Sequence, residues 1–133
     1  MIDFWKAIYT FFSATPHNAF YTAIGGRFYY GEAKQGASFP YAVYFGSSQS
    51  DEDTFSETID EVAFQINIYS DKKTSTEAMQ LSDYCRELFD GASVTPAGYK
   101  DCYIKREMIA PPIKTTGNEW FAALEFMNYL QEE

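Results

Sequence analysis

Few side chains in this sequence have the types and spacing that catalysis requires. His17 is the only histidine, and Cys85 and Cys102 are the only cysteines. A Ser-His-Asp or Cys-His arrangement would have to use His17 as its base, and nothing near it in the sequence resembles a nucleophile elbow. His17 follows Pro16 near the expected start of a helix, so we assign it a surface or capping role. We therefore expect no catalytic residue and no enzyme.

Metal, phosphate and cofactor sites have no better support. The single histidine and the two cysteines, which lack CxxC spacing, do not form a recognisable His/Cys metal site. Asp51-Glu52-Asp53 could contact a calcium ion, but the spaced loop with its central glycine is missing. Gly25-Gly26 precedes an expected strand rather than a helix, so it is not placed to hold phosphate at a helix N-terminus. We expect neither a metal nor a cofactor.

Negative charge dominates the chain and is unevenly distributed. The net charge is −9, and because such a surface repels phosphate we expect no direct, sequence-specific binding of nucleic acid. Residues 51–61 contain six acids and no base. We define a candidate acidic loop, which is either simply solvated or a patch that docks or repels a partner: Asp51, Glu52, Asp53 and Glu57. Asp83 and Glu87, four residues apart, are expected on the solvent face of a helix.

Length and composition favour one folded domain. The 133 residues are close to the commonest domain size, so residues 1–133 are expected to form a single domain. The 11 Tyr, 12 Phe and 2 Trp exceed what one small core needs, and some are expected to cover a partner subunit. We expect two free thiols in a reducing compartment. Without a signal peptide or membrane-length apolar run, the expected location is cytoplasm or an assembly built there.

The N-terminal third is predicted to contain two helices. The first covers about residues 2–14, with an apolar face at helical spacing made of Trp5, Ile8, Tyr9 and Phe12. Pro16 is predicted at the first position of a short second helix capped by Thr15. Gly25-Gly26 is predicted to end that helix, because glycine adopts the left-handed conformation without steric cost.

The rest of the chain is predicted to form strands around one long helix. Strands are expected over residues 27–31, 41–46, 61–69, 98–109 and 119–130, with a polar hairpin loop over 47–59. Strict alternation in the third strand places one set of side chains on a buried face: Val62, Phe64, Ile66 and Ile68. The final strand places on one side Trp120, Ala122, Leu124 and Phe126.

A capping box, Thr74-Ser75-Thr76-Glu77, is predicted to open the long helix, which runs to about Phe89. Its core stripe comprises Ala78, Leu81, Cys85 and Leu88. The expected order is α-α-β-β-β-α-β-β. This order favours an α+β fold, with a mostly antiparallel sheet of about five strands packed against the N-terminal helices and one long helix.

An ordered set of short motifs resembles one protein family. The motifs are Ile24-Gly25-Gly26-Arg27-Phe28-Tyr29, Ala33-Lys34-Gln35-Gly36-Ala37 and Phe39-Pro40-Tyr41-Ala42-Val43-Tyr44, followed by the alternating strand 62–69 and the helix 74–89. In order and spacing, about residues 5–90 resemble the tail-completion proteins of long-tailed phages, also called tail-to-head joining or tail-terminator proteins. The family usually has an aliphatic residue after the arginine, whereas Phe28 stands here.

The resemblance implies a structural part of a virion. Such a subunit forms a ring, expected to be a hexamer, that caps the tail tube and joins the tail to the head. Its expected partners are further copies of itself, the tail tube protein and the head connector or completion protein. Its expected place is the virion tail, assembled in the cytoplasm of the bacterial host, with no membrane contact. The candidate subunit interface comprises Arg27, Tyr29, Tyr41, Tyr44 and Tyr69.

Two other functions fit the same residues. One is a small α+β ligand-binding domain or enzyme, which would need a deep apolar pocket containing ordered polar groups. The other is an acidic DNA-mimic inhibitor, whose carboxylates should be spread at phosphate-like spacing. Here six of the 19 acids crowd into residues 51–61.

Overall fold

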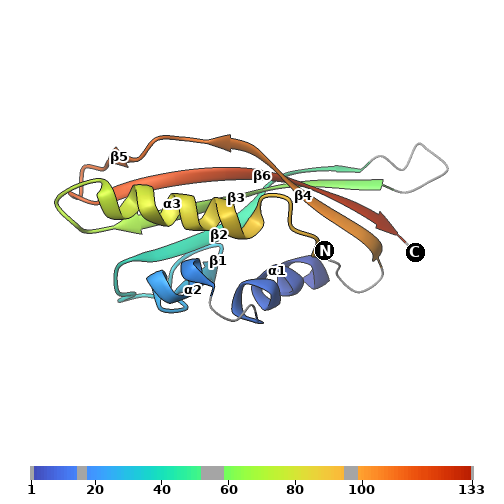
Figure 1. Ribbon diagram of the computed structural model, residues 1–133, viewed down its shortest axis with the longest axis horizontal. Helices are drawn as coiled ribbons and strands as arrows, with labels where there is room; N and C mark the ends of the chain where they lie inside the picture. The colour runs from blue at the N-terminus through green and yellow to red at the C-terminus, as the bar shows by residue number, and fades with distance from the viewer. Residues whose placement is uncertain (1, 15–17, 52–58, 95–98, 133) are drawn as a thin grey trace.

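A computed structural model describes residues 2–14, 18–51, 59–94 and 99–132. Its sheet has the strand order β1-β2-β3-β6-β4, with the short β5 paired to β6 (Figure 1). The strands are β1 (Phe28–Tyr30), β2 (Tyr41–Asp51), β3 (Ile59–Ser70), β4 (Tyr99–Ile109), β5 (Ile113–Lys114) and β6 (Trp120–Glu132). All pairs are antiparallel except β1 with β2. The predicted α+β class and element order are confirmed, and β5 is an additional two-residue strand.

Three helices pack over one face of this sheet: α1 (Ile2–Ala14), α2 (Ala19–Ile24) and α3 (Thr76–Phe89). Alternate residues of the strands meet them in one core, because successive strand side chains point to opposite faces. The core-facing apolar side chains of β3 are the predicted set Val62, Phe64, Ile66 and Ile68, and those of β6 include Ala122, Leu124 and Phe126. From the helices, the core receives Phe4, Ile8, Phe12, Phe20, Ile24, Leu81, Cys85 and Phe89.

The buried stripe of α1 contains two of the four predicted residues, Ile8 and Phe12, and Phe4 takes the place of Trp5 and Tyr9. Phe4, Ile8 and Phe12 are buried at a spacing of four, whereas Trp5 is half-buried and Tyr9 is 43% exposed. The prediction included both Trp5 and Tyr9 because aromatic residues occur on two adjacent stripes of this helix. Only packing against Phe64 and Phe28 selects the core stripe. The second stripe lines a surface groove.

The start of α2 also differs from the prediction. Asn18, not Thr15, is the N-cap, and its Oδ1 accepts a hydrogen bond of 3.1 Å from the Tyr21 backbone N–H. Its Nδ2 donates to the Phe12 carbonyl at 2.9 Å, so one buried side chain caps α2 and also binds the end of α1. Because α2 begins at Ala19, Pro16 is not its first residue; residues 15–17 lie outside the described part of the chain. Gly25 ends the helix in the left-handed conformation, with φ of 59°, as predicted.

The polar stretch after Gly46 belongs partly to the sheet. β2 continues to Asp51, which lies opposite Asp60 of β3, so the predicted loop over 47–59 is too long. The ladder here is made by backbone groups, which a polar run such as Ser-Ser-Gln-Ser supplies as well as an apolar one. Of the candidate acidic loop, Asp51 is the last residue of β2, and Glu52, Asp53 and Glu57 lie outside the described residues.

The predicted capping box of α3 does not form. Ser75 is the N-cap and makes no side-chain capping bond. Instead, the Glu77 carboxylate accepts a hydrogen bond of 2.7 Å from the Ser70 hydroxyl. Ser70 is fully buried at the end of β3, so this bond connects the first turn of α3 to the sheet. Burial of a hydroxyl without a partner is costly, and this cost favours the Ser70 partner over the helix terminus.

Candidate subunit interface

The face of the sheet opposite the helices carries the largest set of aromatic side chains outside the core. We call it the helix-free face. By strand alternation and register, it comprises Tyr41, Val43 and Phe45 of β2, Gln65, Asn67 and Tyr69 of β3, Phe121, Ala123, Glu125, Met127 and Tyr129 of β6, and Tyr103, Lys105 and Met108 of β4. In the described part of the chain, α1, α2 and α3 contribute to the core on the other side. None of the described helices covers this face.

One line of residues crosses the helix-free face from β2 to β5. Tyr41 lies opposite Tyr69, Tyr69 opposite Phe121, and Phe121 opposite Ile113. The ring centroids of Tyr41 and Tyr69 are 5.1 Å apart with nearly parallel planes, and those of Tyr69 and Phe121 are 5.4 Å apart. We call Tyr41, Tyr69 and Phe121 the aromatic row. Ile113, at its end, is 58% exposed, so the row ends in an apolar residue open to solvent.

At the β4 end of the helix-free face, the aromatic side chains form no continuous row. Tyr103 of β4 stacks on Tyr129 of β6, with centroids 6.4 Å apart, and is 52% exposed. Met108 is 48% exposed, and Lys105 beside it adds a charge. The helix-free face is thus aromatic at the β5 end and mixed at the β4 end.

The structure brings together three of the five predicted interface residues. Tyr29, on β1, contacts Tyr41 with centroids 6.3 Å apart and so extends the aromatic row, which already contains Tyr69. Tyr44 points the other way: it is 4% exposed and stacks on Phe28 in the core. Arg27 has an internal role, described next.

The Arg27 guanidinium forms hydrogen bonds to the segment that leads into β2. Its Nε donates a hydrogen bond of 2.9 Å to the carbonyl of Pro40, and one Nη donates at 3.5 Å to the carbonyl of Phe39. Tyr41, the first residue of β2, follows directly, and Phe39 contacts its ring. Through these hydrogen bonds, Arg27 holds in place the two residues that precede Tyr41, where the aromatic row begins.

Sequence reasoning missed two members of this surface, Phe121 and Ile113. Phe121 alternates with the predicted core residues of the last strand, and that alternation was the available signal. Ile113 follows Pro111-Pro112, and because prolines are unfavourable in strands, the sequence did not predict the short strand β5. Only the pairing of Ile113 with Phe121 shows that it joins the row.

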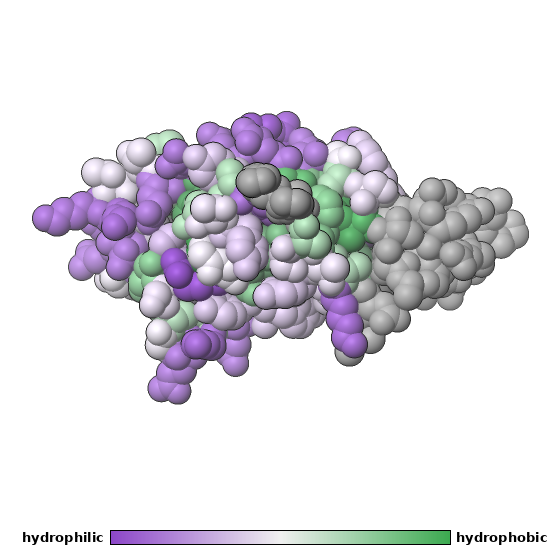
Figure 2. All heavy atoms as spheres, turned by 60° about the horizontal axis from the view of Figure 1, so that its bottom comes forward, coloured by the Kyte–Doolittle hydropathy of each residue, from purple (hydrophilic) through white to green (hydrophobic). Residues whose placement is uncertain are grey.

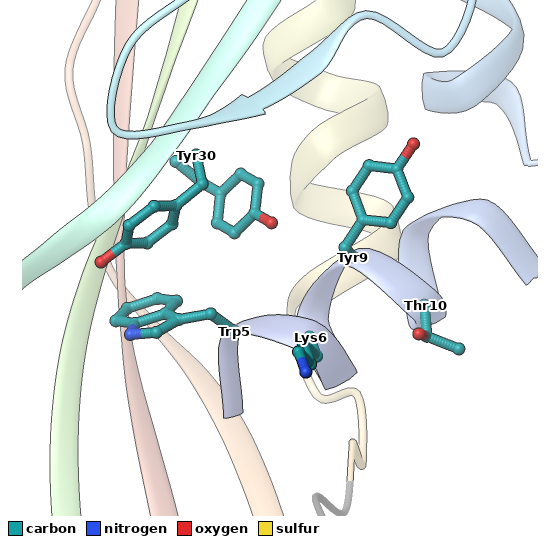
Figure 3. A pocket seen from close by; sticks show the side chains of 6 residues that line it. Trp5, Lys6, Tyr9, Thr10 and Tyr30 are labelled. Carbon is teal, nitrogen blue, oxygen red and sulfur yellow. The ribbon is translucent and has the colours of Figure 1, made fainter. Parts of the chain in front are cut away.

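A surface groove lies between α1 and the β1–β2 edge of the sheet. This groove, with a volume of about 590 Å³, is lined by Trp5, Lys6, Tyr9, Thr10, Tyr30 and Tyr44. Figure 3 shows the Trp5 ring beside the Tyr30 ring, with Lys6 and Thr10 on the same helix.

Figure 2 shows one face of the molecule, with hydrophobic residues reaching the surface near its middle and strongly polar residues gathered at its left end.

The sheet leaves little room for growth at its β4 edge. Gly91 and Ala92, after α3, exchange backbone hydrogen bonds of 2.9 and 3.0 Å with Ile104. The Asp90 carboxylate accepts a hydrogen bond of 3.1 Å from the Arg106 N–H. A covered edge cannot pair with a strand of another chain there.

Comparison with known proteins assigns the family. The model of the family described as tail completion protein gp17 matches residues 6–108. The chain belongs to this family. No curated protein matches the sequence.

Solved structures support the fold of this tail completion protein. A chain of the virion of a native gene transfer agent particle is similar with a TM-score of 0.80 and 11% identity, covering 93% of this chain and 91% of that one. A second solved structure is similar with a TM-score of 0.61 and 12% identity, covering 97% and 96%. At such identities the likeness concerns the fold alone. Family membership supports a structural role in assembly of a virion tail.

The residues with potential chemistry in this tail completion protein are placed as follows. His17 lies outside the described residues. Cys85 is fully buried, and burial raises the pKa of its thiol well above the usual value, which disfavours the nucleophilic thiolate. Cys102 lies in β4 opposite Leu130. Within the described ranges, no three His, Cys, Asp or Glu side chains are grouped to hold a metal ion, and none of the helices could cross a membrane.

The buried Tyr44 predicts a pH dependence of stability. Burial, and then the neighbouring Tyr9 and Tyr30, raise the pKa of Tyr44 to about 12. The native state therefore holds this proton more tightly than the unfolded chain, whose tyrosines have a pKa of about 10. The stabilisation is fully present below about pH 10 and is lost as the pH rises to about 12.

Urea unfolding midpoints measured across this range test the prediction. The Tyr44→Phe variant should show a shallower fall than the unchanged chain, and equal slopes would contradict it.

Proposed function

We propose that this tail completion protein forms a ring, expected to be a hexamer, that caps the tail tube and joins the tail to the head. Each subunit is one domain spanning residues 1–133. The observation that carries the proposal is the aromatic row of Tyr41, Tyr69 and Phe121 on a sheet face that none of the described helices covers. In this proposal, the row and Tyr29 belong to the contact between subunits.

The chemistry of the row fits a contact between proteins. Aromatic side chains are enriched at interfaces and supply large contact areas with little loss of side-chain entropy. Burial raises the pKa of Tyr41, with Glu119, Tyr69 and Tyr29 as further causes. A tyrosine hydroxyl is neutral at physiological pH, so it can donate a hydrogen bond to a partner. A ring uses two different surfaces of each subunit, which repeat around the closed cycle.

The proposed partners besides further copies are the tail tube protein and the head connector or completion protein. The proposed place is the virion tail, assembled in the cytoplasm of the bacterial host. Of the two alternative functions, the ligand-binding domain would need ordered polar groups inside a deep pocket. The groove beside α1 instead lies at the surface, and its one charged residue, Lys6, is exposed.

Deletion of the gene in the parent phage tests the proposal. Without the ring, tube growth is not terminated and heads do not attach, so electron microscopy should show overlong or unjoined tails. Expression of the unchanged chain from a plasmid should restore joined particles. Tails of normal length attached to heads in the deletion strain would exclude this function.

A further inference from the structure

The connection from β1 to β2 ends directly before the aromatic row. It comprises residues 31–40, most of which are exposed to solvent. Tyr41, the first residue of β2, lies opposite Tyr69, so strand pairing holds it from one side only. Exposed connections are generally more mobile than the elements that they join. A second point of attachment close to the start of β2 would therefore restrict the Tyr41 ring to one orientation.

Arg27 supplies such an attachment on both sides of Tyr41. Its Nε donates a hydrogen bond of 2.9 Å to the Pro40 carbonyl, and one Nη donates at 3.5 Å to the Phe39 carbonyl. Its own carbonyl accepts a hydrogen bond of 3.0 Å from the Ala42 N–H. A guanidinium holds its donors in a fixed plane and therefore loses less freedom per hydrogen bond than a lysine amine does. Arg27 thus fixes the residues before and after Tyr41 relative to each other.

The helix α2 determines where the Arg27 side chain lies. The Arg27 N–H donates a hydrogen bond of 3.1 Å to the carbonyl of Ile24, which is fully buried in the core. Gly25 ends the helix with φ of 59°, and a Cβ at this position would lie 2.8 Å from one Nη of Arg27. Because this distance is shorter than a van der Waals contact, a side chain here would displace the guanidinium. Gly25 therefore both ends α2 and leaves room for the hydrogen bonds to residues 39 and 40.

Residues 39 and 40 determine the surroundings of the Tyr41 ring. The centroid of the Phe39 ring lies 5.1 Å from that of Tyr41, and those of Tyr29 and Tyr69 lie 6.3 and 5.1 Å from it. Phe39 is itself half-buried. A shift of the backbone at residues 39–40 would therefore move the rings of Phe39 and Tyr41 together and interrupt the aromatic row at its β2 end.

We infer that Arg27 is a positioning residue for the proposed subunit contact. It acts through Tyr41, by holding residues 39–40 so that the aromatic row has its binding shape before a partner arrives. Pre-organisation of this kind lowers the entropic cost of association. Arg27 is half-buried and binds carbonyls of its own chain, which distinguishes its role from a direct contact. The inference rests on the proposed function, since it names the residue on which the aromatic row depends.

Fluorine NMR of the purified full chain tests the positioning directly. Fluorotyrosine replaces Tyr41, and its resonance reports the neighbouring aromatic rings through their ring currents. In the Arg27→Met chain, which keeps an unbranched side chain but has no donors, this resonance should move toward its position in the urea-unfolded chain. A second label in place of Tyr103, which stacks on Tyr129 at the β4 end of the helix-free face, is the control and should not move.

Complementation of the deletion strain tests the consequence for assembly. Arg27→Met should lower the yield of joined particles about tenfold, because a contact weakens in proportion to the fraction of chains that hold the binding shape. Arg106→Met, the same change at an exposed arginine of β4, is the matched control and should have little effect. Equal yields for the two variants would contradict the inference. A lower yield for Arg27→Met with an unmoved label at position 41 would also overturn it, since Arg27 would then contact a partner directly.

A substitution at Gly25 separates the position of the guanidinium from its charge. Gly25→Ala keeps Arg27 but places a methyl group against its Nη, so it should change the resonance and the yield in the same direction as Arg27→Met, by less. Gly91→Ala is the matched control. Gly91 also follows a helix and has a positive φ, of 78°, but a Cβ there would meet no atom within 4 Å apart from its chain neighbours.

Because both alanines adopt a left-handed conformation, their backbone strain is similar and only the displacement of Arg27 differs. Identical resonances and yields for Gly25→Ala and Gly91→Ala would show that the position of the guanidinium does not matter. This pair decides the question if the Arg27→Met chain does not fold.

Failure of the inference is distinguishable from failure of the proposed function. If the deletion strain makes abnormal tails while the Arg27→Met chain restores joined particles, the capping function stands and only the role of Arg27 is wrong. A deletion strain with normal joined tails would instead reject the function itself.

Discussion

Replacement of Phe28 by alanine is expected to lower the free energy of unfolding by about 3–5 kcal/mol. Phe28 is 3% exposed, and its ring stacks on Phe12 of α1 and on Tyr44 of β2, with both centroid distances at 4.3 Å. It also contacts Phe20 of α2 and Phe89 of α3. A cavity at this position would face all three helices, and rings packed on several sides cannot collapse into it.

Urea denaturation of the purified chain measures this loss. Tyr29→Ala is the matched control, because the neighbouring residue of the same strand lies half-buried on the other face and should cost far less. Phe28→Leu, which retains most of the volume, should cost less than about 1.5 kcal/mol. A loss below about 1 kcal/mol for Phe28→Ala would show that the centre of the core lies elsewhere.

Replacement of Tyr69 by lysine is expected to abolish completion of tails while leaving the chain folded. Tyr69 is the middle of the aromatic row, between Tyr41 and Phe121. In the free chain it is half-buried on an open face, so the lysine amine can reach water. In the proposed ring the same amine would be desolvated at each subunit contact, at a cost of several kcal/mol per contact. Every 1.4 kcal/mol weakens a contact about tenfold.

The measurement is the number of joined particles when the Tyr69→Lys chain complements the deletion strain, with circular dichroism to confirm folding. Met79→Lys is the control, since Met79 is 49% exposed on α3, on the opposite side of the sheet. A folded Tyr69→Lys chain that restores joined particles as well as Met79→Lys would show that the helix-free face is not a subunit contact.

Most of the elements could be predicted because their signals are local. The alternation of Val62, Phe64, Ile66 and Ile68 has the period of a strand, and any sheet that covers one face buries this set. The left-handed conformation at Gly25 depends on a single residue. The family resemblance followed from the same stretches, because their order and spacing are properties of the chain itself.

The candidate site could be predicted only in part. Tyr41 and Tyr44 stand three residues apart in a strand with aromatic residues on both faces, so composition cannot say which one is buried. Helices from elsewhere in the chain cover the face of Tyr44, which leaves it only 4% exposed. Arg27 entered the candidate interface through the motif that carries the family resemblance, whereas here two of its donors are engaged by backbone carbonyls of its own chain.

The sequence by itself determined the class of fold, the core face of β3 and the family, because these depend on residue periods and order along the chain. For α3 it identified Ala78, Leu81 and Cys85, but the buried residue at the end of this helix is Phe89 rather than the predicted Leu88. Only the tertiary structure decided that Tyr41, Tyr69 and Phe121 form one row, that Ile113 ends it, and that a groove lies beside Trp5. The physical reason is that strand register and helix placement join residues far apart in sequence. No local pattern records which of two aromatic faces the helices will cover.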